Sequence, residues 1–512
     1  MPLTPLIGRD ELLALIVGEL GTHRLVTLTG PGGSGKTRLA IATATWMAAV
    51  DGEGRPEPVG AWFVDLSVVD TPMRVPDAVA AALGARDEAG RDAIDVVADE
   101  IGSSSILLVL DNCEHLVAGA AEIAGRLLAR CARLRILATS RIALRIPAEA
   151  TVAVPPLAGP EPGTGHTLAG LAERPASRLF LDRARARTGR AVAAADADAV
   201  ARLCAELDGL PLAIELAAAR TPLLTVPEIV DRLQTDLRLL RSPDPTAPAR
   251  HRTVAAAVES SVDQLSAGAR GLFDRLAVFA GGFDAEAGLA VGGPGPPNRL
   301  DALLEASLVE AVPSGGGSPR YRMLAPIRRH ALDRLASRDG EASARRGHAR
   351  YFLGLAERAD SELRGANQGV WLARLRRDAA NLRAAMGWLS EAGAAAEPYA
   401  DLRLAAALAS YCRLEGHYRD GRRWLAAALA RHPDAPAPLR ARAGAGAAML
   451  AMLLCEYDAA AAFAEAARVA CRVAGDLLGE ARVELTLGSV ARERGDYPAS
   501  SAHLDAAARL FG

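Results

Sequence analysis

The sequence THRLVTLTGPGGSGKTR at residues 22–38 places a candidate strand, a glycine-rich loop and the start of a candidate helix in direct succession. Residues 22–29 alternate between apolar and polar side chains, which is typical of a strand. Residues 38–50 are rich in Ala, Leu, Met and Trp and read as a helix. A strand, a glycine loop ending in Lys-Thr and a helix form the context of a P-loop, so we expect an α/β domain here.

The loop at 30–37 has the composition needed to hold phosphate groups. Its glycines let backbone N–H groups turn toward phosphates without obstruction by a Cβ, and the next helix adds positive potential. We expect Lys36 to reach the β- and γ-phosphates and Thr37 to ligate Mg²⁺, which predicts an ATP/ADP site. The residues predicted to bind the nucleotide here are Gly30, Pro31, Gly32, Gly33, Ser34, Gly35, Lys36, Thr37 and Arg38.

Lys36 is the only lysine among the 59 lysines and arginines of the chain. The abundance of Ala and Arg resembles that of proteins from high-GC bacterial genomes, in which Arg replaces Lys wherever a generic positive charge suffices. A compact ammonium is not replaced so easily in a tight phosphate cradle. The lone lysine therefore supports the P-loop interpretation.

A second candidate element is the apolar run at 106–110, which predicts a central parallel strand covered on both faces. It ends in Asp111, at the edge where open α/β sheets bind ligands. We predict that Asp111 holds Mg²⁺ directly or through water, as a Walker B carboxylate. The alternative is an Asp that only caps a helix after the strand. Glu114, three residues later, is a candidate catalytic residue.

Further strands are predicted at 61–66, 134–138 and 152–157, the last an edge strand stopped by prolines. Their alternation with helices implies a doubly wound α/β domain. Arg141 follows the strand at 134–138, where a guanidinium could sense a γ-phosphate, or could be an ordinary surface arginine.

Helical patterns fill about 176–240, and Pro211 within GLPLAI at 209–214 is placed to open a helix. A proline-rich linker at 242–250 precedes more helices. A helix at 300–307 followed by strands at 308–312 and 321–324, joined by a glycine-rich tip, predicts a winged helix. Such a module contacts DNA or serves protein packing, and the sequence leaves both open.

From about residue 341 the chain reads as nearly all helical, with a repeat. Tyr418, Tyr457 and Tyr497 lie in similar short motifs 39 and 40 residues apart. This spacing predicts stacked helical hairpins of the tetratricopeptide type, which present concave surfaces to ligands. A non-repetitive bundle is the alternative. We also expect the natural protein to continue beyond residue 512.

These features predict a multidomain protein: a P-loop nucleotide-binding domain at 1–158, a helical domain at 159–241, a winged-helix domain at 250–340 and a TPR-like superhelix at 341–512. The net charge of −2 argues against chain-wide attraction to nucleic acid or anionic lipid. The longest apolar run, at about 444–455, is too short to span a membrane. Scattered cysteines and no secretory leader predict a cytoplasmic protein with reduced thiols.

The order of motifs resembles the STAND class of signalling ATPases. It is similar in particular to the NB-ARC-type core of large bacterial LuxR- and SARP-associated regulators. The matching stretches are LIGRDE at 6–11, GPGGSGKT, LLVLDNCEHL, ILATSR, GLPLAIELAAAR, RHRTV at 250–254, YRMLAPIRRHA at 321–331 and NLRAA at 381–385.

The resemblance implies roles that spacing alone does not. Ile7 and Arg9 match the segment that contacts adenine and ribose, Pro211 matches a proline that packs on the adenine, and Arg141 matches a sensor arginine. It also implies an ADP-closed state, release on exchange for ATP, a nucleotide-dependent homo-oligomer, and a protein or small-molecule inducer on the repeats.

Two departures limit the resemblance. Asn112 follows Asp111 where many relatives carry a second acid, and an amide cannot act as a general base. We therefore expect slow hydrolysis, with Glu114 as a possible replacement base. His330 is a weak candidate for a phosphate-sensing histidine, and DNA binding would need a domain not seen in these residues. A constitutive ATPase, a small-molecule kinase and a scaffold with structural nucleotide remain alternatives.

Overall fold

The computed structural model describes residues 5–49, 60–84, 91–161, 163, 165–233, 239–241, 252–296, 298–312, 319–392 and 397–511. The chain divides into two compact units. The first comprises residues 1–274, 295–311 and 323–334, and the second comprises residues 275–294, 312–322 and 335–512. The predicted linker at 242–250 and all but the last residue of the predicted tip at 313–319 lie outside the described residues.

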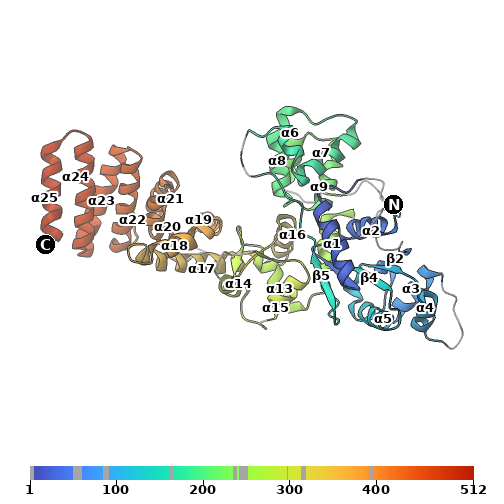
Figure 1. Cartoon of the computed structure of the whole chain (residues 1–512). Helices are drawn as coiled ribbons and strands as arrows, with labels where there is room; N and C mark the ends of the chain where they lie inside the picture. The colour runs from blue at the N-terminus through green and yellow to red at the C-terminus, as the bar shows by residue number, and fades with distance from the viewer. Residues whose placement is uncertain are drawn as a thin grey trace. The chain divides into compact units, whose positions relative to one another are not determined.

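The first unit contains a five-stranded parallel sheet with strand order β2-β3-β4-β1-β5 (Figure 1). The predicted parallel α/β sheet is confirmed. β1 lies between β4 and β5, and the P-loop follows it. The strands are β1 (Leu25–Thr29), β2 (Gly60–Asp65), β3 (Ile106–Asp111), β4 (Leu134–Thr139) and β5 (Glu149–Ala153).

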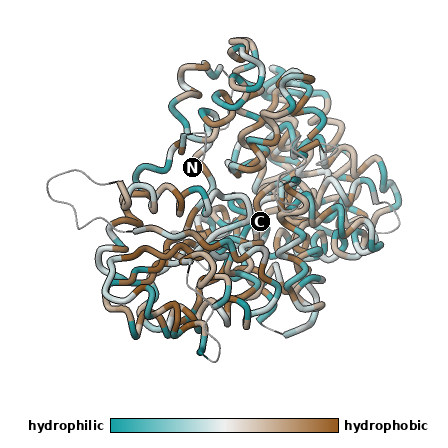
Figure 2. Tube along the Cα trace, turned by 90° about the vertical axis from the view of Figure 1, so that its right-hand side faces the viewer, coloured by the Kyte–Doolittle hydropathy of each residue, from teal (hydrophilic) through white to brown (hydrophobic). Residues whose placement is uncertain are grey.

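Helices cover both faces of this sheet, which explains the apolar character of β3. Val109 faces a core that includes Ile16 of α1 and Leu39 of α2. Leu108 faces the opposite core, which includes Val79 of α3 and Ile123 of α5. Figure 2 shows hydrophobic residues running along the strands of this region. Around the sheet lie α1 (Asp10–Thr22), α2 (Lys36–Ala48), α3 (Val75–Leu83), α4 (Ala93–Ile101) and α5 (Val117–Arg130), with short 3-10 turns η1 (Leu66–Val68), η2 (Pro72–Arg74) and η3 (Cys113–His115).

A helical segment follows β5 and is tied back to the sheet domain. Gly209 has φ +66°, and a Cβ there would lie 1.9 Å from the Leu157 carbonyl oxygen, so a side chain does not fit. The Leu157 N–H donates to the Gly209 carbonyl at 2.9 Å, which fixes the start of the next helix. The helices are α6 (Leu168–Ala172), α7 (Pro175–Thr188), α8 (Ala197–Glu206), α9 (Pro211–Ala218) and α10 (Val226–Leu233), with η4 (Ala194–Asp196) before α8.

The region of the predicted winged helix contributes helices and short strands. Phe283 pairs with Tyr321 and Asp284 with Arg320 in the antiparallel ladder of β6 and β8. The elements are α12 (Val254–Val262), α13 (Ala267–Leu276), β6 (Phe283–Asp284), α14 (Ala285–Gly292), α15 (Arg299–Glu305), β7 (Glu310–Val312), β8 (Arg320–Arg322) and α16 (Ala325–Ala336).

The second unit is otherwise helical. Asn381 stabilises its start, since its side chain accepts from the Ala280 N–H at 2.8 Å and donates to the Gly282 carbonyl at 2.7 Å. The helices are α17 (Glu341–Glu362), α18 (Gln368–Arg377), α19 (Ala379–Ala392), α20 (Ala400–Leu414), α21 (Tyr418–Arg431), α22 (Ala437–Leu453), α23 (Tyr457–Ala474), α24 (Leu477–Glu493) and α25 (Tyr497–Phe511).

Each tyrosine of the predicted repeat is the first residue of a helix: Tyr418 of α21, Tyr457 of α23 and Tyr497 of α25. Consecutive helices pack together as α20 with α21, α22 with α23, and α24 with α25. Within the described part of the chain, every helix is too short or too polar to span a lipid bilayer.

Shortening Leu108 to Ala tests the central strand. The side chain is fully buried, so we expect the variant to lose about 2–5 kcal/mol of unfolding free energy. Leu223→Ala is the matched control, because Leu223 is 80% exposed and its loss should change stability by less than about 0.5 kcal/mol. Urea unfolding of both variants measures the difference. Equal effects would contradict the assignment of β3 as the buried centre of the sheet.

Candidate functional site

The P-loop runs from the end of β1 into α2. Gly33 has φ +83°, a backbone conformation that favours glycine. A Cβ on Gly33 would lie 2.8 Å from the Leu212 Cβ. The Leu212 N–H also donates to the Gly33 carbonyl at 3.2 Å. The start of α9 therefore supports the loop from outside the sheet.

The Lys36 ammonium lies under the loop that precedes it. Its Nζ donates to the Gly30 carbonyl at 2.7 Å and to the Pro31 carbonyl at 3.0 Å. Burial lowers the pKa of Lys36 to about 8, and the nearby carboxylate of Glu114 acts in the opposite direction. A buried ammonium among carbonyl dipoles is a ready partner for an incoming anion.

Thr37 and Asp111 meet at the carboxyl end of β3. The Thr37 hydroxyl lies 2.9 and 3.1 Å from the two carboxylate oxygens of Asp111. Asp111 is 2% exposed and also accepts from the Thr139 hydroxyl at 2.5 Å and from the Asn112 side-chain amide at 2.6 Å. These partners hold the carboxylate in place, which suits a metal ligand.

Arg141 connects the end of β4 to α12. Its Nη2 donates to the Ser260 hydroxyl at 2.7 Å and to the Ala257 carbonyl at 3.2 Å. Its Nε lies 3.3 Å from a carboxylate oxygen of Glu114. The Ser307 hydroxyl donates to the Arg141 carbonyl at 3.2 Å. Both the side chain and the backbone of this arginine thus contact the segment that follows α10.

A charged cluster behind α12 fixes its position. His330 Nε2 lies 2.6 Å from the Glu259 carboxylate. Arg334 donates to Glu259 at 2.5 Å and to Asp274 at 2.9 Å. His330 is therefore engaged in packing α16 against α12 and does not line the cavity described below.

The side of α9 that faces the P-loop carries Glu215, one helical turn after Pro211. Its Oε1 accepts from Arg38 Nη1 at 2.8 Å and from Arg183 Nε at 3.1 Å. Arg38 belongs to the first turn of α2 and Arg183 to α7. The carboxylate therefore joins three helices.

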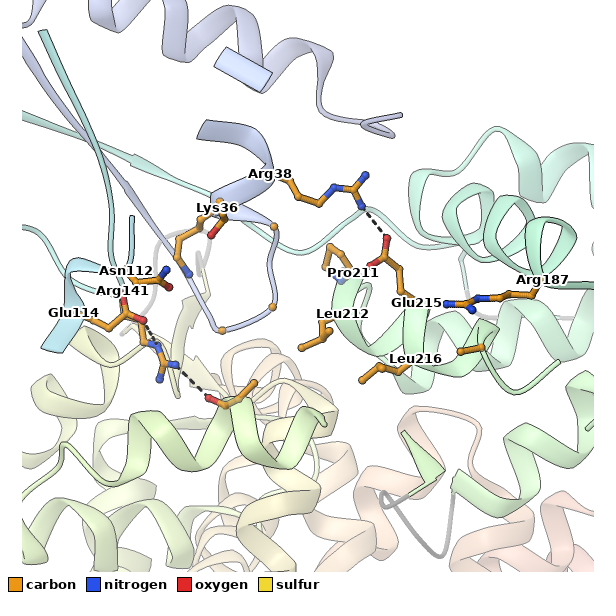
Figure 3. A pocket seen from close by; sticks show the side chains of 16 residues that line it. Lys36, Arg38, Asn112, Glu114, Arg141, Arg187, Pro211, Leu212, Glu215 and Leu216 are labelled. Atoms are coloured by element: carbon orange, nitrogen blue, oxygen red, sulfur yellow. Dashed lines mark hydrogen bonds and ion pairs between the residues drawn. The ribbon is translucent and has the colours of Figure 1, made fainter. Parts of the chain in front are cut away.

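These groups border one cavity of about 360 Å³ (Figure 3). Glu114 and Arg141 lie at one end, and Glu215 and Arg187 lie at the other, with the P-loop between them. The cavity is lined by Gly32, Gly33, Gly35, Lys36, Thr37, Arg38, Asn112, Glu114, Arg141, Arg187, Pro211, Leu212, Glu215, Leu216, Ala219 and Ala257.

Most of the predicted site residues line this cavity, but some of them do not. Ile7 and Arg9 do not line it: Ile7 is buried, and the Arg9 guanidinium donates to the Ser34 and Pro155 carbonyls at 3.3 and 2.5 Å. Arg9 thus supports the P-loop backbone. Gly30, Pro31, Ser34 and Asp111 are likewise not among the residues that line the cavity.

Several residues that line the cavity were not predicted from the sequence. Glu215 could have been found, because it follows Pro211 by four positions and shares its helix face. Ala257 and Arg187 offered no such indication, since no local motif relates them to the P-loop. The same holds for Ser260, which contacts Arg141 but does not line the cavity.

Comparison with known proteins places the chain in a family. Residues 265–336 match the model of a winged helix-turn-helix domain, so the predicted winged helix is present. The uncharacterized protein Rv0894 of Mycobacterium tuberculosis is 39% identical over 350 residues, which cover 67% of this chain and 84% of that protein. The chain belongs to the family of Rv0894.

A longer protein is also similar to this chain. The M. tuberculosis protein named "Putative HTH-type transcriptional regulator Rv0890c" is 37% identical over 412 residues, or 79% of this chain. The chain spans only 44% of the length of that relative.

Among solved structures, a STAND protein with a tetratricopeptide repeat sensor, PH0952 from Pyrococcus horikoshii, aligns over 100% of this chain and 79% of its own. The identity is 15% and the TM-score 0.28. The Aeropyrum pernix ORC2 protein aligns over 66% of this chain and 96% of its own, with 15% identity and a TM-score of 0.35. Scores this low do not establish a common arrangement of domains.

The cluster behind α12 predicts a pH dependence. Burial acts to raise the pKa of Glu259, but its hydrogen bond with His330 and the charge of Arg334 outweigh burial, so the pKa is lowered. A carboxyl group whose pKa is lowered by folding stabilises the folded state at pH values above its unfolded pKa, here about 4.5. That stabilisation is lost as the pH falls through the pKa of the folded state.

We therefore expect Glu259→Gln to lower the melting temperature at about pH 6, with the gap to the natural chain closing as the pH falls below about 4.5. Thermal unfolding across this range measures it. Glu173→Gln, at an exposed position of the same unit, is the control and should show no such closing gap. A gap that widens in acid would contradict the assignment.

Proposed function

We propose that the chain is an ATP/ADP-binding signalling switch of the STAND class, with an NB-ARC-type core, that acts in transcriptional regulation. The observation that carries this proposal is that Lys36 and Thr37 line one cavity beside a glycine loop, and that the Thr37 hydroxyl pairs with the Asp111 carboxylate. An ammonium and a hydroxyl–carboxylate pair are the groups that a metal–polyphosphate requires.

The residues present fit both the nucleotide and the metal. The Ser34 hydroxyl is 1% exposed and has no hydrogen-bond partner among the described residues, so this P-loop position has an unused polar group. Mg²⁺ prefers oxygen ligands and keeps several waters and phosphate oxygens. Thr37 and Asp111 would hold it, and the described residues contain no cluster of three or more acidic, His or Cys ligands that would suggest another metal site.

Arg141 and α12 suggest how the switch is closed. Ala257 lines the cavity, and its carbonyl and the Ser260 hydroxyl both accept from Arg141. A γ-phosphate offers Arg141 stronger, charged acceptors than a hydroxyl and a carbonyl. Binding of ATP would therefore draw Arg141 away from α12, whereas ADP leaves this contact intact.

Hydrolysis is proposed to be slow. The Asn112 side chain donates to Asp111, which supports a positioning role for the amide. Glu114 lies on the cavity wall and is the candidate base, but Arg141 holds one of its oxygens. A carboxylate oxygen in contact with a guanidinium is occupied and does not orient a water molecule.

The wider role extends the same proposal. The helical pairs of the second unit form a TPR-like superhelix that takes a protein or small-molecule inducer. The nucleotide-dependent form is a homo-oligomer. Each copy has the four predicted domains, at 1–158, 159–241, 250–340 and 341–512. The name of Rv0890c supports a role in transcriptional regulation, and the winged helix-turn-helix match at 265–336 supports contact with DNA. The proposed location is the cytoplasm.

Replacing the lone lysine tests nucleotide binding. Lys36→Ala should weaken binding of Mg·ADP by about 100-fold, because the charge-assisted contact with the β-phosphate is lost. Isothermal titration calorimetry of the full chain measures the affinity. Arg423→Ala removes an exposed positive charge from the second unit and should leave the affinity unchanged. No heat of binding with the natural chain would refute the proposal.

Weakening the contact between Arg141 and α12 tests the switch. Ser260→Ala removes one acceptor, so we expect the ratio of ATP-analogue to ADP affinity to rise by about tenfold. Calorimetry with a non-hydrolysable analogue provides the ratio, and size-exclusion chromatography shows whether assembly follows. Ser361→Ala, on α17 of the second unit, is the control. An unchanged ratio would leave α12 without a role in nucleotide preference.

A further inference from the structure

The two ends of the cavity are lined by different kinds of residue. Lys36, Thr37 and the end of β3 mark the phosphate end, where Glu114 and Arg141 also lie (Figure 3). The opposite end is formed by α9 and α7, with apolar wall residues Pro211 and Leu216 and the charged side chains of Glu215 and Arg187. A nucleotide whose terminal phosphates lie against Lys36 would place its nucleoside at this opposite end.

Glu215 is the acidic member of the nucleoside end. Its Oε1 accepts from both Arg38 and Arg183, and the side chain is 32% exposed toward the cavity that it lines. Within the part of the chain that the structure describes, both guanidiniums donate to Oε1, so Oε2 is the oxygen that a ligand can use. The two guanidiniums come from different helices, α2 and α7, so the carboxylate is oriented before any ligand arrives.

The position of Arg38 relates Glu215 to the P-loop. Arg38 directly follows Thr37 in the first turn of α2, whose N-terminus faces the phosphate chain. Glu215 is in direct contact with the Arg38 guanidinium. With the terminal phosphates of a nucleotide at Lys36, Glu215 would lie on the side of the sugar, which connects the phosphates to the base.

An ionised carboxylate can only accept hydrogen bonds. The donors that a nucleotide carries beyond its phosphates are the ribose hydroxyls and the exocyclic amine of the base. The ribose is the nearer group, and the base would lie further along, against the apolar surface of Pro211 and Leu216. A carboxylate that accepts from ribose hydroxyls is an established means of sugar recognition in other nucleotide sites.

We propose that Glu215 accepts hydrogen bonds from the ribose hydroxyls, so that the cavity selects ribonucleotides over deoxyribonucleotides. This inference rests on the proposed function, because it needs the nucleotide to bind with its phosphates at the P-loop. Arg38 and Arg183 are positioning residues, since they hold Glu215 and act through it.

The test combines variants of the protein with analogues of the nucleotide. Calorimetry measures the affinity of the full chain, and of its Glu215→Ala and Glu215→Gln variants, for four ligands. The ligands are the Mg²⁺ complexes of ADP, 2′-deoxy-ADP, 3′-deoxy-ADP and inosine diphosphate. Glu173→Ala, on the same unit, is the control. The natural chain should bind ADP about tenfold more tightly than at least one deoxy analogue, since a hydrogen bond to a charged group is lost.

In Glu215→Ala this preference should fall to within about twofold, and Glu215→Gln, which keeps the side-chain shape, should retain an intermediate preference. A uniform loss of affinity for all four ligands, with the ribose preference retained, would show a purely structural role and overturn the inference. So would a loss confined to discrimination between ADP and inosine diphosphate, because Glu215 would then read the base.

The role of Glu215 and the binding of nucleotide are overturned by different results. Tight binding of ADP by the natural chain without any ribose preference overturns the role of Glu215 and leaves the proposed function standing. Absence of binding for every nucleotide, in the natural chain as in the variants, refutes the proposed function itself.

Discussion

The pairing of the Thr37 hydroxyl with the Asp111 carboxylate is the contact on which the arrangement of the cavity depends. Thr37 stands at the start of α2, after β1, and Asp111 ends β3. The two strands are not neighbours, because β4 lies between them. Only a parallel sheet brings the carboxyl ends of all three strands to the same edge. The Thr139 hydroxyl, from the end of β4, completes the group by donating to the same carboxylate.

Segments remote in sequence close the cavity around this edge. Leu212 supports the P-loop from α9, and Ala257 and Ser260 hold Arg141 from α12. Each of these contacts uses a backbone group or a short side chain, so helix and loop backbones come close together. Any change in the partners of Arg141 is therefore also a change in the contacts of α12.

Much of the first unit could be predicted from the sequence because its causes are local. An unbroken apolar run predicts a strand buried on both faces, and the glycine loop with its following helix is a contiguous motif, so β3, Asp111 and the P-loop were all expected. The partners of Arg141 and the bonds between Glu215 and Arg183 depend on how distant helices pack. No periodicity in the chain encodes those pairings, and for the same reason the contacts of Arg9 with the P-loop backbone were not foreseen.

The rarity of lysine has a chemical consequence. The chain carries 59 lysines and arginines, of which one is lysine, so 58 are arginines. Guanidiniums resist acylation under conditions in which amines react. The single side-chain amine lies beneath the carbonyls of Gly30 and Pro31. Acetyl transfer or another acylation of a side-chain amine would therefore act at the P-loop, because every other Lys or Arg side chain of the chain is a guanidinium.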